Sequence, residues 1–248
     1  MITNYYRPET LEETLNLLAQ PTARPMGGGT WLNLAHDEQF SVVDLQAIGL
    51  NSLRKAGNSL EIDACVTLQQ LLESPESPEA LKQALRQGVS INLRNAATVA
   101  GSLVTCDGRS SFATSMLALD AKLSISRAQN VTVVGLGEFL ALRPAGLITS
   151  ISIALNVRTA FESVARSPMD KPIVCAALTQ WTGGRTRLAL GGYGKSPLLA
   201  MDGTEPDGVE AAARNAFHEA GDEWASAEYR ADVAATLTRR CLEKVAGA

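Results

Sequence analysis

Histidine and cysteine are scarce in this sequence, and neither forms a metal-binding pattern. The chain of 248 residues has two histidines, His36 and His218, and four cysteines that nowhere form a C-x-x-C pair. Such spacing does not favour zinc, an iron–sulfur cluster or a redox dithiol. We therefore expect four reduced thiols and no metal bound by this chain. The sequence also lacks paired carboxylates beside a histidine and any G-x-S-x-G motif, so we expect no catalytic side chain.

Charge and long apolar runs are also limited. Only 19% of residues are charged, the formal net charge is −4, and lysines and arginines are scattered along the chain. This distribution argues against nucleic acid or an anionic membrane as a partner. No segment reaches the ~20 apolar residues that a membrane-spanning helix needs, and residues 1–9 do not resemble a secretion signal. We therefore expect a cytoplasmic protein without a membrane span.

The apolar residues that are present, 46% of the chain, suffice for one large or two modest domains. Helical spacing and capping residues predict helices over 10–19, 67–72, 79–87, 112–119 and most of 209–245. Alternating or continuous apolar runs predict strands over 42–45, 60–66, 122–126, 131–134 and 151–157. A hairpin is predicted over 173–190, with its turn at Gly183-Gly184. Turn-forming prolines at 168 and 172 place a domain boundary nearby, so we divide the chain into 1–160, split near 57, and 161–248.

Three consecutive glycines, Gly27 to Gly29, stand between the predicted helix over 10–19 and the strand over 42–45. Glycine can adopt positive φ and lets successive N–H groups converge on an anion, most often a phosphate. A plain glycine-rich turn between two elements is the alternative. The run predicts a place where backbone meets a ligand.

A second unusual segment covers residues 92–111 and is small, polar and rich in hydroxyl groups. Such residues let backbone approach a nucleotide closely while offering N–H and hydroxyl donors. A serine- and threonine-rich loop leading into the helix over 112–119 would explain the same composition. The segment alone therefore leaves both interpretations open.

Taken together, the two segments resemble those of the FAD-binding medium subunit of the molybdenum hydroxylase family, the xanthine dehydrogenase and carbon monoxide dehydrogenase type. Members carry an A-G-G-T-D-L-like loop followed by an I-R-N-x-A-T-I-G-G-N-like loop. The corresponding residues here are G-G-G-T-W-L at 27–32 and L-R-N-A-A-T-V-A-G-S at 93–102. Further similarities at 6–8, 166–170, 188–192 and 226–230 extend the resemblance over nearly the whole chain.

The resemblance implies an α+β fold, with a two-part FAD-binding α/β domain followed by a small domain of a three-stranded antiparallel sheet and helices. It implies FAD as cofactor, with the pyrophosphate on both loops and an apolar residue against the ring system. Ser111 stands where members commonly have an aspartate near the nucleotide. The implied cofactor-binding residues are Gly27, Gly28, Gly29, Thr30, Trp31, Ala97, Thr98, Gly101, Ser102, Ser111 and Ile148.

The function implied by the resemblance is electron transfer within a larger enzyme. FAD would receive electrons from an iron–sulfur small subunit and pass them to an external acceptor, while a large molybdenum-cofactor subunit oxidises the substrate. A stand-alone FAD oxidoreductase and a non-catalytic assembly subunit that has lost flavin are the alternatives. These three hypotheses differ in whether the chain binds FAD and whether it needs partner subunits.

Overall fold

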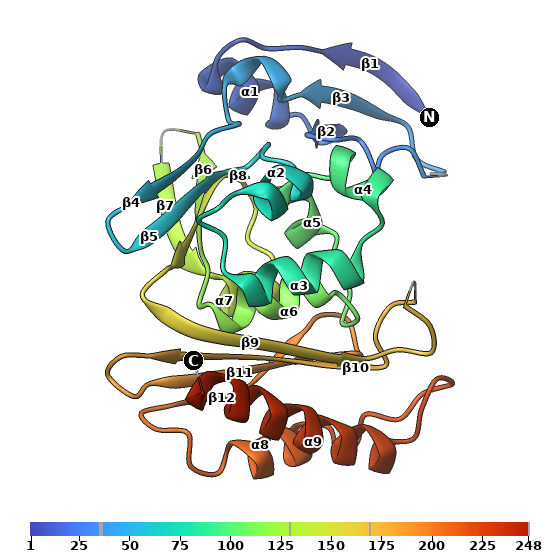
Figure 1. Cartoon of the computed structure of the whole chain (residues 1–248). Helices are drawn as coiled ribbons and strands as arrows, with labels where there is room; N and C mark the ends of the chain where they lie inside the picture. The colour runs from blue at the N-terminus through green and yellow to red at the C-terminus, as the bar shows by residue number, and fades with distance from the viewer. Residues whose placement is uncertain (35–36, 129, 169, 248) are drawn as a thin grey trace.

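A computed structural model describes residues 1–34, 37–128, 130–168 and 170–247 of the chain. In the described part, three β-sheets lie one below the other, with helices between and around them (Figure 1). The expected α+β class is confirmed. No helix in these ranges combines the length and the apolar character that crossing a bilayer requires.

The first sheet is parallel, with the strand order β1-β3-β2. Helix α1 follows β1 and begins where the Thr10 hydroxyl accepts a hydrogen bond from the Glu13 N–H at 3.2 Å, as its sequence predicts. The middle strand, β3, is buried along its whole length because it has a neighbour on each side. The bounds are β1 Ile2–Tyr6, α1 Leu11–Leu18, β2 Ala23–Met26, β3 Phe40–Asp44 and the short helix η1 Gln46–Ile48.

The second sheet is antiparallel, with the order β4-β5-β8-β6-β7, and six helices accompany it. Thr67 caps α2 in a reciprocal box with Gln70, which confirms the helix start predicted there. The strands are β4 Leu53–Ala56, β5 Ser59–Asp63, β6 Lys122–Arg127, β7 Asn130–Gly135 and β8 Leu147–Ala154. The helices are α2 Leu68–Glu73, α3 Glu79–Gly88, α4 Ile91–Ala96, α5 Val99–Val104, α6 Ser111–Ala118 and α7 Leu136–Leu142.

The third sheet is antiparallel with the order β12-β11-β10-β9, one strand more than the three expected from the resemblance. The additional strand, β9, covers residues beyond those we predicted to be a strand. The strand predicted over 151–157 corresponds to β8, which ends at Ala154, and after Leu155-Asn156 the new strand begins in the third sheet. The bounds are β9 Val157–Val164, β10 Val174–Trp181, β11 Thr186–Gly191, β12 Leu198–Gly203, α8 Val209–Ala216 and α9 Ala227–Ala246.

The third sheet is covered on both faces, which explains why its central strands, β10 and β11, are mostly apolar. Helices α3 and α6 lie against one face, and α8 and α9 lie against the other (Figure 1). Strand β11 is accordingly buried throughout, and β10 over its first six residues. Buried residues of this sheet belong to both apolar cores of the described chain. The domain division at 160 stays a prediction. Strand β9 runs across that point, so the two predicted domains would share this strand.

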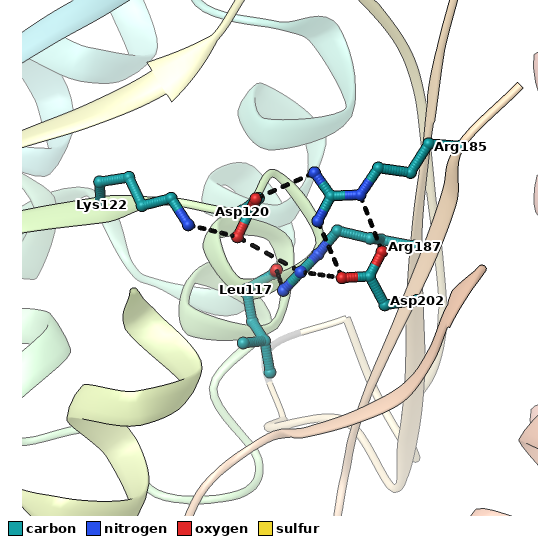
Figure 2. Close-up of polar contacts among 6 residues, drawn as sticks. All are labelled: Leu117, Asp120, Lys122, Arg185, Arg187 and Asp202. Carbon is teal, nitrogen blue, oxygen red and sulfur yellow. Dashed lines mark hydrogen bonds and ion pairs between the residues drawn. The ribbon is translucent and has the colours of Figure 1, made fainter. Parts of the chain in front are cut away.

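A network of ion pairs connects the second sheet with the third (Figure 2). Arg187, a buried residue of β11, lies 2.6 Å from Asp202 and 3.3 Å from Asp120, and it donates to the Leu117 carbonyl at 3.2 Å. Arg185 binds both oxygens of Asp202, at 2.9 and 2.8 Å, and reaches Asp120 at 3.1 Å. The two carboxylates thus join the turn after α6 to the strands β11 and β12.

We predict that Asp202→Asn destabilises the protein, because Arg187 then keeps its buried charge with one carboxylate fewer. The free energy of unfolding in urea should fall by about 2 kcal/mol, between the values for exposed and buried ion pairs. Glu79→Gln breaks the exposed pair with Arg86 and serves as the control, with a smaller effect. An equal decrease in the free energy of unfolding in the two variants would contradict the structural role of the network.

The Asp202 carboxylate should also make the stability of the protein depend on pH. Hydrogen bonding from Arg185, with the nearby charge of Arg187, holds the pKa of Asp202 below its ordinary 3.8. The resulting stabilisation is complete above the pKa of the unfolded carboxyl and is lost as the pH falls through the lower folded pKa. Urea titrations between pH 5 and pH 2 should therefore show a shallower acid loss for Asp202→Asn than for the wild type.

Candidate functional site

A cavity of about 460 Å³ lies where the first sheet meets the second. Its wall is formed by the end of β2 and the glycine loop, by α5, and by the connection from α7 to β8. This is the size range of sites that hold small molecules and cofactors. The predicted cofactor-binding residues that line it are Gly27, Gly28, Gly29, Thr30, Trp31, Thr98, Gly101 and Ile148.

Residues of the glycine loop that line this cavity have backbone donors that the described chain does not use. Within the described residues, the N–H groups of Gly27 to Thr30 have no hydrogen-bond acceptor. Gly29 has φ of +68°, which turns the chain, and its carbonyl accepts from the Asn33 N–H at 3.0 Å. Consecutive free N–H groups around a residue of positive φ can bind an anion. The loop therefore has the donor set that a pyrophosphate requires.

Gly28 has a packing role that the sequence did not reveal. A Cβ atom at this position would lie 1.6 Å from the carbonyl oxygen of Ala96, closer than any side chain can approach backbone. The glycine loop therefore touches the 96–98 segment backbone to backbone. Only glycine permits this contact, which brings the two loops predicted from the sequence to the same cavity.

The second segment is not the open loop expected from its composition, because α4 and α5 occupy most of it. Ala97 and Thr98 connect these helices in extended conformation, and Thr98 caps α5 by accepting from the Gly101 N–H at 3.2 Å. The N–H groups of Val99 and Ala100 donate to the carbonyls of Val66 and Ala64. The small side chains thus allow close packing, while many of the backbone donors are already used within the chain.

Three of the predicted residues do not line the cavity: Ala97, Ser102 and Ser111. The N–H groups of the first two donate to the carbonyls of Leu93, at 2.7 Å, and Thr98, at 2.9 Å. Ser111 is buried in the first turn of α6, close to Gly88 of α3. Their contacts with a cofactor stay predictions.

The part of the cavity wall formed by residues 139–148 is largely apolar. It includes Phe139, Pro144, Leu147 and Ile148, of which Ile148 is buried and pairs with Ile125 in β6. This is a surface suited to an aromatic ring system. The cavity therefore combines polar backbone on one wall with apolar side chains on another.

Arg24, Cys65 and Arg143 also line the cavity, although no sequence motif indicated them. Burial, together with the charges of Asp44 and Asp63, raises the pKa of the Cys65 thiol to about 11. Cys65 is therefore a neutral thiol at physiological pH and a poor nucleophile. Cys65 and Arg143 are single side chains far in sequence from the glycine run, and Arg24, three residues before it, belongs to no recognised motif.

His218, the histidine within the described residues, gives no sign of a catalytic site. His218 is exposed after α8, where its ring contacts the carbonyl of Asn215 and lies 3.5 Å from Glu219. It does not line the cavity. His36 lies outside the described residues.

Comparison with known proteins agrees with this geometry. A family model described as the FAD binding domain in molybdopterin dehydrogenase matches residues 1–158. The chain belongs to this family and is an FAD-binding subunit of the molybdenum hydroxylase type, with FAD as its cofactor.

Individual relatives extend the similarity beyond the matched domain. The chain is 28% identical to YgfM of Escherichia coli K12, over 96% of this chain and 94% of that protein. It is 26% identical to the 6-hydroxypseudooxynicotine dehydrogenase complex subunit alpha of Paenarthrobacter nicotinovorans, over 97% and 93%. Among solved structures, reconstituted CO dehydrogenase from Oligotropha carboxidovorans superposes with a TM-score of 0.80 at 25% identity, covering 98% of this chain and 96% of that one.

We predict that Gly28→Ala weakens FAD binding and also destabilises the protein, because the added methyl group forces the glycine loop away from Ala96. The free energy of unfolding should fall by about 2 kcal/mol, as in other overpacked sites. Titration of free FAD, followed by its fluorescence, would report the affinity.

The matched control is Gly183→Ala, in the turn between β10 and β11, where an added Cβ meets nothing within 4 Å. Its FAD affinity should equal that of the wild type. Unchanged affinity and stability in Gly28→Ala would show that the two loops are not held together as described.

Proposed function

We propose that FAD occupies this cavity with its pyrophosphate on the backbone of Gly27 to Trp31, and that the chain conducts electrons within a larger enzyme. The observation that carries the placement is the row of unpaired N–H groups from Gly27 to Thr30. The charge of the wall supports it, because the charged residues among its described lining are two arginines, Arg24 and Arg143. A dianionic pyrophosphate is attracted to such a site.

The role of the chain in the reaction is to hold and orient the cofactor. Bound FAD supplies the redox chemistry, since it exchanges one or two electrons. The glycine loop would fix the pyrophosphate, while Phe139 and Ile148 would cover part of the ring system and exclude water. The neutral Cys65 thiol adds no charge to the wall.

We also propose, on the basis of the family, that the electrons come from an iron–sulfur subunit and pass to an external acceptor. The substrate would be oxidised on a separate molybdenum subunit. One relative is named as a subunit of a dehydrogenase complex, and another, from Sulfolobus acidocaldarius, as a glyceraldehyde dehydrogenase medium chain. Both names fit a protein that works with other chains. We place the complex in the cytoplasm, where free thiols like the four of this chain persist.

The proposal predicts a yellow protein that occurs in a complex. The chain purified alone should show flavin absorption, or gain it with one FAD per chain on reconstitution. Isolated from its native cell through an affinity tag, it should bring an iron–sulfur subunit and a large molybdenum-containing subunit with it.

The results separate the three functions considered. A colourless chain that FAD cannot reconstitute would contradict the proposal and favour an assembly subunit. A yellow chain that turns over a small substrate without partners would instead identify a stand-alone oxidoreductase.

A further inference from the structure

Arg143 occupies an unusual backbone conformation on the cavity wall. It ends α7 with φ of 46° and ψ of 54°, in the left-handed region that residues other than glycine seldom adopt. This conformation is strained for a residue with a Cβ atom. Strain of this kind is a reason to examine what the side chain does there.

The contacts of Arg143 fix its guanidinium against the end of α5. One nitrogen donates to the carbonyls of Leu103 and Val104, at 3.2 and 2.9 Å, and the other lies 4.0 Å from the Cys106 sulfur. The guanidinium also lies over the ring of Phe139, at 5.3 Å from the ring centre. A cation held by several partners keeps its position when a ligand enters.

The charge of Arg143 is not balanced by an acidic side chain. Across the ranges that the structure describes, no aspartate or glutamate forms an ion pair with it, and none lines the cavity. Arg24, the other cationic residue of the wall, pairs with Glu38 at 3.5 Å. Arg143 is therefore the stronger source of positive potential on the wall, beside Phe139 and Pro144.

We propose that Arg143 is a positioning residue for FAD, whose fixed charge strengthens binding of the anionic cofactor and raises the reduction potential of the bound flavin. The inference rests on the proposed placement of FAD in this cavity. The same wall contains Ile148, the residue that the resemblance assigns to the ring system. A nearby cation favours the reduced flavin because reduction adds electrons to the ring.

The test compares Arg143→Gln and Arg143→Lys with the wild type in the full-length chain loaded with FAD. Both substitutions introduce side chains with a Cβ atom, so the left-handed backbone costs about the same in each. Arg239→Gln is the control, since it removes one positive charge from an exposed residue of α9, beyond the third sheet (Figure 1).

Two quantities are measured: the dissociation constant for FAD at low and high salt, and the midpoint potential by equilibration with a dye of known potential. Arg143→Gln should weaken binding on the order of tenfold at low salt and less at high salt, since salt screens the charge. If the reduced form loses tenfold more affinity than the oxidised form, the midpoint potential falls by about 30 mV. Arg143→Lys should keep most of the wild-type affinity for FAD and most of the wild-type midpoint potential.

Each other outcome contradicts a defined part of the inference. Weaker binding with unchanged potential and salt dependence would mean that Arg143 only supports α5, which overturns the electrostatic role. Values for Arg143→Gln equal to those for Arg239→Gln would overturn the inference while leaving the FAD site intact. A wild-type chain that takes up no FAD would overturn the placement of the cofactor itself.

Discussion

The cavity depends on one contact, the approach of the Gly28 backbone to the carbonyl of Ala96. The glycine loop belongs to the first sheet and the 96–98 segment to the second, so this contact joins them at the site. The positive φ of Gly29 then turns the loop, and the N–H groups of Gly27 to Thr30 are left without acceptors among the described residues. The glycine run thus has a packing role and a binding role, carried by neighbouring residues.

The two loops that face the cavity differ in how their backbone donors are used. In the first, the N–H groups of Gly27 to Thr30 have no acceptor among the described residues and are available to a ligand. In the second, the donors of residues 99–102 satisfy carbonyls and the Thr98 hydroxyl within the chain. The first loop therefore binds through backbone groups, while the second shapes the wall with small side chains. Ala100 in place of a glycine and Ser102 in place of an asparagine suit that second role.

Much of the fold was predictable because its signals are local. Thr10 and Thr67 cap helices through residues only three positions away, and the hairpin turn at Gly183-Gly184 lies between clearly apolar strands. Strand β9 was missed because Leu155-Asn156 carries no strong turn signal, so the apolar alternation of β8 was extended to Val157. Of the site, the motifs indicated the glycine loop and Thr98. Arg143 was beyond prediction, since its role depends on α5, some 40 residues earlier in the chain.

The direct connection from β8 to β9 has a mechanical consequence. Only Leu155 and Asn156 separate these strands, and the ion pairs of Asp120 and Asp202 join the same two sheets elsewhere. Two sheets linked so tightly are expected to move as one rigid body. The first sheet is joined through the longer segment 45–52 and through close packing at the glycine loop. Any widening of the cavity to admit a cofactor would then be a displacement of the first sheet against a stationary remainder.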